Sequence, residues 1–319
     1  MQKSKLYSIV VPCYKSGLWT DELVLRITTA MKNAGAECEI LLVNDCSPDT
    51  VTWPAICSAA RKYEHVRGID MLYNVGQFRA TLCGLDQANG DYCITLDDDL
   101  QHLPEELPKL LKAMDENPEM DCIMGAFDSK KHSLLRNIGS RFMQKISGIL
   151  YGKRQDVTTT SFRIMPSSFA KTLVLYRTAT PHLGPLIVSL SQNIMNIPVE
   201  HAERKYGRSG YTLARCIRET WQCIINASIF PLRMLSALGG FFSLVAFFIA
   251  ITYFLRFLVY GTSVPGYTSL ILVISFFSGL ILLGVGILGE YVGRLIREVT
   301  GLPPFRIKSD TAECKEAKR

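Results

Sequence analysis

Asp97, Asp98 and Asp99 are three consecutive carboxylates that directly follow a short apolar strand predicted over 92–96, and Gln101 comes two residues later. Carboxylates this close repel one another and lose hydration where the end of a strand is buried. A bound cation removes that cost, and hard oxygen ligands favour Mg²⁺ or Mn²⁺, which take phosphate oxygens as further ligands. Asp97 and Asp99 share one face of an extended segment because side chains alternate along it. The motif therefore predicts a metal site that binds a diphosphate.

The bulk composition indicates a membrane-associated protein. The chain has 319 residues, of which 48% are hydrophobic, and a net charge of +6. Its basic residues cluster around both ends of an apolar C-terminal region, which suits anionic lipid headgroups and argues against a nucleic-acid partner. The ten cysteines show no CxxC or zinc-type spacing, so we expect reduced thiols that face the cytosol. The short polar stretch 1–7 is not expected to be a signal peptide.

The first 130 residues alternate strand and helix patterns, which predicts an α/β fold with a mainly parallel sheet covered on both faces. In such sheets, ligands bind beyond the carboxyl ends of the strands. Polar residues collect at four of these ends, and four ends in register indicate a nucleotide pocket. The expected strands are 8–11, 39–43, 66–72, 92–96 and 121–127, and the polar ends are 12–14, 44–45, 74–77 and 97–101.

Two long apolar runs, 234–255 and 267–289, contain no charged residue. Each is long enough to cross a hydrocarbon core of about 30 Å, although buried helices of a soluble domain are the alternative. The amphipathic stretch 212–229 is either an ordinary packing helix or a helix in the membrane interface, and the apolar run after it favours the interface. Arg233 and Arg294 flank the hairpin, so the positive-inside rule places the catalytic domain and both termini in the cytoplasm. We therefore expect a multi-pass protein of the inner or plasma membrane.

This pattern divides the chain into four regions. A cytosolic catalytic domain covers 1–210, and an amphipathic interfacial region covers 211–232. Two transmembrane helices follow within 233–291, and a basic cytosolic tail covers 292–319.

In this order, the motifs resemble those of membrane-bound family 2 glycosyltransferases that act on a polyprenyl phosphate. The group includes bactoprenol glucosyltransferases, the undecaprenyl-phosphate aminoarabinose transferase and dolichyl-phosphate mannose synthase. The resemblance covers nearly the full length, including the membrane hairpin. The matching stretches are 11–14, 41–47, 74–77, 95–101 with 104–106, 162–163, 202–211, 231–235 and 288–294.

The resemblance implies a GT-A fold and a metal-dependent enzyme that uses Mg²⁺ or Mn²⁺. Its partners would be a nucleotide-sugar donor, a polyprenyl phosphate acceptor such as undecaprenyl phosphate, and membrane lipids. Transfer with inversion would give a lipid-phosphate-linked sugar for cell-envelope glycan modification. Relatives form homo-oligomers, often tetramers, and we expect the same here.

The resemblance also implies roles for residues at the strand ends. Pro12, Tyr14 and Asp45 should hold the nucleoside, Gln77 should lie near the nucleotide, and Asp97 should lie between the sugar and the diphosphate. Pro12 and Tyr14 could alternatively do no more than end a strand.

The metal and the phosphates have their own expected ligands. Asp99 and Gln101 should bind the metal, although Gln101 could instead cap the following helix, and Asp98 occupies a variable position of the family and is treated as a spectator. Asp97, Asp99 and Arg163 are the expected catalytic residues, and Arg163 should lie near the phosphates. Further candidates for the lipid phosphate or diphosphate are Arg136, Arg141, Arg204 and Ser209, of which the first two could be a solvated helix face.

The chain departs from the family pattern in two places. Lys15 and Ser16 stand where Asn-Glu is common, and Thr160 and Ser161 stand where several relatives carry an aspartate. A lipid monophosphate is mostly dianionic at pH 7, so it is already a nucleophile and needs no general base. The departures leave a non-catalytic membrane scaffold or lipid-binding pseudo-transferase as the alternative. A processive polysaccharide synthase is less favoured, because the chain has no Gln-x-x-Arg-Trp motif and too few spans.

Overall fold

The computed structural model describes residues 5–127, 157–176, 183–200, 202, parts of 237–259, 266–299 and 305–312. The chain forms two compact units. Unit 1 comprises Met1–Thr212 and Leu302–Arg319, and unit 2 comprises Leu213–Gly301. The chain therefore leaves unit 1 once and returns to it near its C-terminal end.

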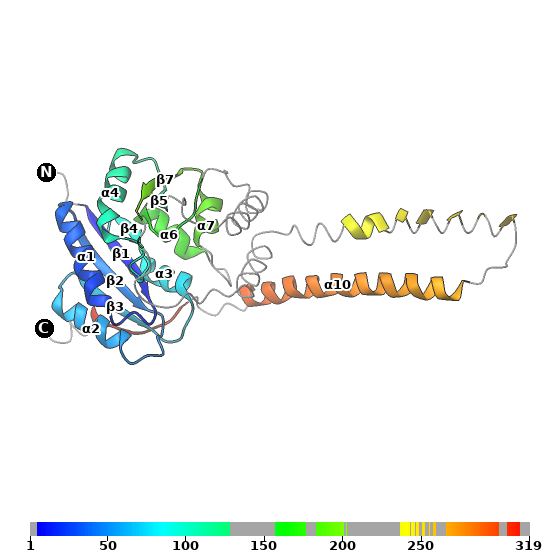
Figure 1. The fold of residues 1–319 in the computed structure, drawn as a ribbon, viewed down its shortest axis with the longest axis horizontal. Helices are drawn as coiled ribbons and strands as arrows, with labels where there is room; N and C mark the ends of the chain where they lie inside the picture. The colour runs from blue at the N-terminus through cyan, green and yellow to red at the C-terminus, as the bar shows by residue number, and fades with distance from the viewer. Residues whose placement is uncertain are drawn as a thin grey trace. The chain divides into compact units, whose positions relative to one another are not determined.

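Unit 1 is built on one sheet of eight described strands in the order β7-β5-β6-β4-β1-β2-β3-β8 (Figure 1). The neighbours β4, β1, β2 and β3 are parallel, as are β5 and β7. In contrast, β6 is antiparallel to β4 and β5, and β8 is antiparallel to β3. The strands are β1 Leu6–Cys13, β2 Glu37–Asn44, β3 Val66–Met71, β4 Tyr92–Thr95, β5 Cys122–Phe127, β6 Arg163–Pro166, β7 Ile194–Val199 and β8 Ile307–Asp310.

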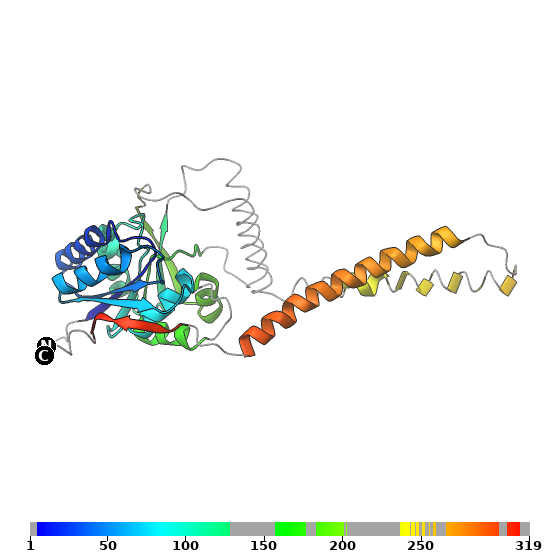
Figure 2. The same ribbon diagram turned by 90° about the horizontal axis from the view of Figure 1, so that it is seen from below.

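Helices cover both faces of this sheet (Figure 2). Along β2, Ile40 and Leu42 pack into one hydrophobic cluster, and Leu41 and Val43 pack into the other. This alternation is the period of two expected of a strand buried on both sides. The first cluster takes its helical residues from α1, α2 and α4, and the second from α3, α6 and α7. The helices are α1 Thr20–Asn33, α2 Thr52–Lys62, α3 Gln77–Asp86, the 3-10 turn Pro104–Glu106, α4 Leu107–Glu116, α6 Ser167–Leu175 and α7 Leu183–Leu190.

The predicted mainly parallel α/β sheet with helices on both faces is confirmed. The edge strand β8 was not predicted, because Ile307–Asp310 lies within the stretch 292–319 that the sequence indicated as a basic tail. Four residues with lysine and serine among them carry little strand signal of their own, and only pairing with β3 makes them a strand.

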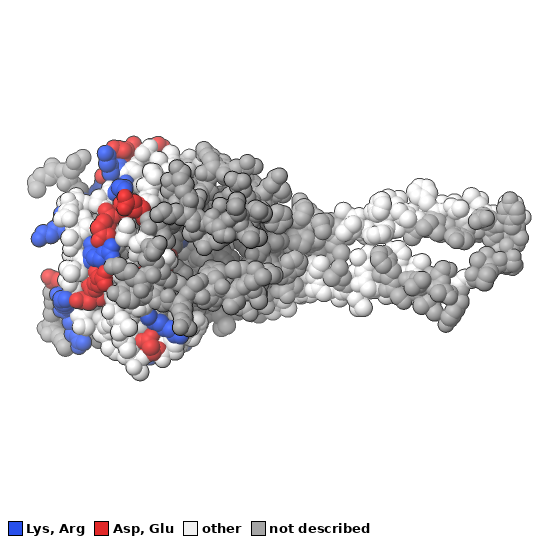
Figure 3. All heavy atoms as spheres, viewed as in Figure 1, with Lys and Arg blue, Asp and Glu red and all other residues white. Residues whose placement is uncertain are grey.

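Unit 2 contains the 33-residue helix α10, Tyr267–Val299, and helical turns within 237–259. The rings of Phe242 and Phe277 meet edge to face at 6.1 Å between centroids. Large apolar side chains are widely exposed, as at Phe247 and Leu282. Figure 3 shows charged side chains of both signs on unit 1 and only uncharged ones among the described atoms of unit 2. Within the described residues, no helix combines the length and the apolar character needed to cross a membrane.

Candidate functional site

The loops after β1, β2, β3 and β4 lie at one edge of the sheet, because these strands are parallel neighbours. Each loop holds one residue with a positive φ: Lys15 at 58°, Cys46 at 47°, Gly76 at 85° and Leu100 at 59°. Such a backbone is uncommon for residues other than glycine, and it concentrates at functional sites. The four polar ends predicted from the sequence are therefore brought together, each in a specialised conformation.

Asp97 is held from three directions. Its Oδ1 accepts a hydrogen bond from Gln77 Nε2 at 2.6 Å, and its Oδ2 accepts one from Ser161 Oγ at 2.6 Å. Its backbone N–H donates to His102 Nδ1 at 3.3 Å, and the same ring nitrogen lies 3.6 Å from Asp97 Oδ2. His102 is buried and stacks on Phe162 with the ring centroids 5.5 Å apart. Gln77 and Asp97, both expected near the nucleotide, are thus in direct contact.

Asp98 links two of the loops. Its Oδ2 accepts a hydrogen bond from the backbone N–H of Tyr14 at 2.9 Å, and its carbonyl accepts one from Trp19 Nε1 at 2.6 Å. Burial, reinforced by the charges of Asp97 and Asp99, raises the pKa of Asp98 to about 7. Asp98, which was expected to be a spectator, therefore links the loop 97–101, which carries the three carboxylates, to the loop after β1. Nothing in the sequence signalled these contacts, because they join residues 84 and 79 positions apart.

Asp99 and Gln101 lie next to each other at the end of the same loop. The backbone N–H of Gln101 donates to Asp99 Oδ1 at 3.1 Å, and the Gln101 carbonyl accepts from the backbone N–H of Ala202 at 3.1 Å. Among the described residues, no group of three or more His, Cys, Asp or Glu side chains is placed to hold a metal ion. Mg²⁺ is commonly held by one or two carboxylates with substrate phosphates as the other ligands. A divalent cation would offset the charges of Asp97 and Asp99, which add to the effect of burial on the pKa of Asp98, so the residues fit an ion shared with a diphosphate.

Asp45 fixes the loop after β3. It is 3% exposed, and its carboxylate accepts from the backbone N–H groups of Val75 at 2.7 Å and Gly76 at 2.9 Å. The side-chain amide of Asn74 donates to the same carboxylate at 3.0 Å. Burial raises the pKa of Asp45, and the two backbone donors work against that rise. This loop leads directly into Gln77, the first residue of α3, so Asp45 positions Gln77. Its hydrogen bonds to a nucleoside stay a prediction.

The loop after β1 presents an aromatic ring at this edge. Pro12 is buried in β1, whereas Tyr14 is 46% exposed. Lys15 Nζ lies 5.3 Å from the centroid of the Tyr14 ring. An exposed ring beside a cation can stack on a base while the cation faces a phosphate. The binding of a nucleoside by Tyr14 stays a prediction.

Arg163 is the first residue of β6 and pairs with Thr95 of β4, two residues before Asp97. It is 3% exposed, burial lowers the pKa of its guanidinium, and its Nε donates to Thr95 Oγ1 at 3.0 Å. No described residue accepts a hydrogen bond from its buried Nη1. An unpaired buried cationic donor is costly, and an anionic group would remove that cost. Four other phosphate candidates fall outside the part of the chain that the structure describes: Arg136, Arg141, Arg204 and Ser209.

A family model described as Glycosyl transferase family 2 matches residues 8–173. Glucosyl-3-phosphoglycerate synthase from Mycobacterium tuberculosis, in complex with Mn²⁺, uridine-diphosphate and phosphoglyceric acid, superposes with a TM-score of 0.52 at 14% identity, over 69% of this chain and 76% of that chain. Mannosyl-3-phosphoglycerate synthase from Rubrobacter xylanophilus gives a TM-score of 0.51 at 12% identity, over 74% of this chain and 75% of that chain. At these identities, the structural likeness establishes the fold.

Proposed function

The chain belongs to glycosyl transferase family 2 and has the GT-A fold, and on that premise we propose that it moves a sugar from a nucleotide-sugar donor to a polyprenyl phosphate, such as undecaprenyl phosphate. The transfer inverts the anomeric centre and gives a lipid-phosphate-linked sugar for modifying cell-envelope glycans. One observation carries the proposal: three carboxylates lie at the edge where four strand-end loops meet, and the buried guanidinium of Arg163 is close enough to interact electrostatically with Asp97.

The donor end of the site has residues suited to each part of a nucleotide sugar. The exposed ring of Tyr14 is suited to the base, and Asp97 is suited to the sugar and the diphosphate. Asp99 and Gln101 would hold Mg²⁺ or Mn²⁺ with the diphosphate, and the bound ion would offset the charge that develops on the leaving nucleoside diphosphate. The Mycobacterium tuberculosis synthase named above holds Mn²⁺ together with uridine-diphosphate, which supports this assignment by likeness of fold.

The acceptor chemistry explains why no carboxylate is needed at the position of Ser161. A phosphate monoester is mostly dianionic at pH 7, so one of its oxygens attacks the anomeric carbon without a general base. The bond from that carbon to the diphosphate breaks as the new bond forms, and the nucleoside diphosphate leaves with the electron pair. The chain then has to hold the two phosphates in line rather than move a proton.

Two features of unit 1 support a lipid-borne acceptor. The chain passes the site edge before and after unit 2: Ala202 bonds to Gln101, and the carbonyl of Arg306 accepts from the backbone N–H of Leu72, just beyond β3, at 2.9 Å. Since the segments on both sides of unit 2 belong to unit 1, a hairpin that entered a membrane would return to the same side. The exposed apolar side chains of unit 2 and the two uncharged runs suit a lipid environment, so we propose a multi-pass membrane protein with its catalytic domain and both termini in the cytoplasm.

The experiment is transfer in detergent by the purified full-length chain. It is incubated with a panel of UDP-, GDP- and dTDP-sugars, undecaprenyl phosphate and Mg²⁺ or Mn²⁺, and the lipid product is identified by mass spectrometry. We expect a mass increase of one sugar residue with at least one donor and none with undecaprenol, which lacks the phosphate. Sugar transfer to undecaprenol, or no lipid product from any donor while the protein binds nucleotide sugar and metal, would refute the lipid-phosphate acceptor. The absence of both transfer and metal-dependent nucleotide-sugar binding would favour a scaffold.

The matched variants test the carboxylate loop. Asp99→Ala should reduce turnover to below about one thousandth at saturating Mg²⁺, because the metal and the diphosphate lose their charged anchor. Asp115→Ala is the control, since Asp115 is an exposed carboxylate whose partner is Lys5 at 2.6 Å. Near-normal activity of Asp99→Ala would remove the assigned metal site.

A further inference from the structure

We infer that the Ser161 hydroxyl is a positioning group that, together with the Gln77 amide, fixes the orientation of the Asp97 carboxylate for sugar transfer. The inference rests on the proposed function and adds a residue that the sequence indicated only as a departure from the family pattern. Ser161 Oγ donates to Asp97 Oδ2, and Gln77 Nε2 donates to Oδ1, both at 2.6 Å.

The contact between Ser161 and Asp97 follows from the strand register. β4 and β6 are antiparallel, and Thr95 pairs with Arg163. Continuing this register by two residues past the end of β4 and before the start of β6 sets Asp97 opposite Ser161. Opposed side chains on one face of an antiparallel pair are direct neighbours. The register of β4 and β6 therefore places the Ser161 hydroxyl next to Asp97.

The segment that carries Ser161 is itself held in place. The hydroxyl of Thr95 donates to the carbonyl of Ser161, and Arg163 Nε donates to the same Thr95 oxygen at 3.0 Å. The hydroxyl of Thr160 bonds to the carbonyls of Gly125 at 2.9 Å and Phe162 at 3.1 Å. These bonds anchor the backbone on both sides of Ser161, so its hydroxyl has little freedom to leave Asp97.

A neutral donor suits this position. The terminal torsion of an aspartate is broad, so the plane of its carboxylate is set by its hydrogen-bond partners. A carboxylate offers about four lone-pair sites, and the two donors leave the others for substrate. Bonds to an ionised acceptor are the stronger kind. A carboxylate at position 161 would instead oppose Asp97 with a like charge, in a loop where burial and neighbouring charges already raise the pKa of Asp98.

The test compares Ser161→Ala with Ser161→Thr, using whichever donor of the panel gives lipid product with the unaltered chain. Ser161→Ala should lower kcat by about ten- to a hundredfold, the cost of one hydrogen bond to a charged group. Ser161→Thr keeps the hydroxyl and should restore kcat to within about threefold. Ser189→Ala is the control, since it removes a partly buried serine hydroxyl that donates to the carbonyl of Leu186 at 2.8 Å.

Thermal melting of the same samples separates positioning from folding. Ser161→Ala should melt close to the unaltered chain while its kcat is low. The inference is overturned if Ser161→Ala keeps its kcat within about twofold, if threonine fails to restore activity, or if the loss follows the fraction of unfolded protein. These outcomes differ from failure of the proposed function, in which the unaltered chain itself forms no lipid-linked sugar.

Discussion

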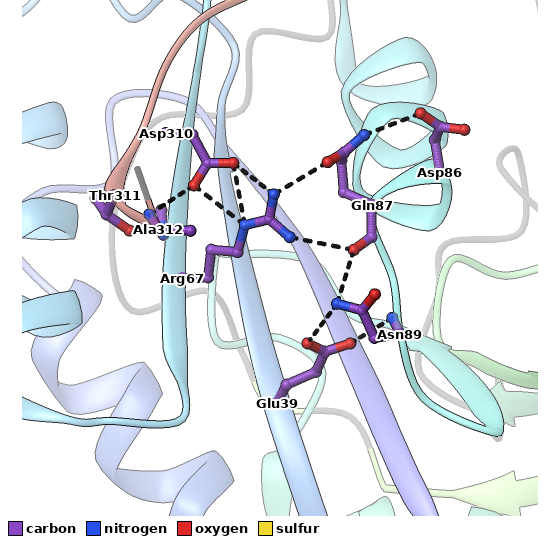
Figure 4. A network of polar contacts seen from close by, with 9 residues as sticks. Glu39, Arg67, Asp86, Gln87, Asn89, Asp310, Thr311 and Ala312 are labelled. Carbon is purple, nitrogen blue, oxygen red and sulfur yellow. Dashed lines mark hydrogen bonds and ion pairs between the residues drawn. The ribbon is translucent and has the colours of Figure 1, made fainter. Parts of the chain in front are cut away.

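Asp310→Ala should destabilise unit 1 although the residue lies in a four-residue edge strand far along the chain from its partners. Figure 4 shows the network: Arg67 in β3 reaches Asp310 in β8 on one side and Gln87 after α3 on the other. Arg67 Nε lies 3.1 Å from both carboxylate oxygens of Asp310, and Nη2 lies 2.5 Å from Oδ2. The Asp310 side chain is 7% exposed and that of Arg67 is 24% exposed.

The magnitude follows from this burial. Breaking a fully buried ion pair costs about 3–5 kcal/mol, because the remaining charge loses its partner. Arg67 keeps Gln87 Oε1 at 3.0 Å and some contact with water, so we expect about 2–3 kcal/mol. The variant also loses the bond from the backbone N–H of Ala312 to Asp310 at 2.8 Å. For a domain of this size, the loss corresponds to a fall in melting temperature of about 4–12 °C.

The assay is thermal unfolding of the full-length chain in detergent, followed by circular dichroism. Asp115→Ala is the control, since its exposed pair with Lys5 should contribute only about 0–1 kcal/mol. A double-mutant cycle with Arg67→Met should give a coupling of about 1–3 kcal/mol. A shift for Asp310→Ala no larger than that of the control, with no coupling to Arg67, would refute the reasoning that β8 is held to the sheet by this pair.

Two further predictions concern the site loop and the packing behind it. The pKa of Asp98 is raised from its ordinary 3.8 to about 7, so between these values the folded protein holds a proton that the unfolded chain releases, and stability falls as pH rises through that window. Asp98→Asn should remove this part of the pH dependence. In EDTA, the melting temperatures at about pH 5 and about pH 8 should therefore differ less in the variant than in the unaltered chain. An equal difference in the two proteins would contradict the prediction. Gly84→Ala should cost about 1–3 kcal/mol in urea unfolding, because a Cβ there would clash with Val10 Cγ1. A free energy of unfolding equal to that of the unaltered chain would show that α3 can shift away from β1.

The sequence by itself predicted the parallel part of the unit 1 sheet and the edge of that sheet where the candidate site lies. Alternating apolar strands and amphipathic helices impose a parallel sheet, and a parallel sheet gathers the carboxyl ends of its strands at one edge. Asp45, Gln77, Asp97 and Asp99 could therefore be assigned to one edge from their positions after the predicted strands alone. The two uncharged apolar runs, 234–255 and 267–289, can also be recognised from the sequence alone.

Only the tertiary structure decided which side chains touch. Ser161 meets Asp97 across 64 residues, Tyr14 meets Asp98 across 84, and Arg67 meets Asp310 across 243. Local periodicity carries no information about such pairs, because strand order and register select them after the sheet has formed. The different roles of the neighbouring carboxylates have the same origin: Asp97 and Asp98 lie side by side in one loop but acquire different partners from elements that are distant along the chain.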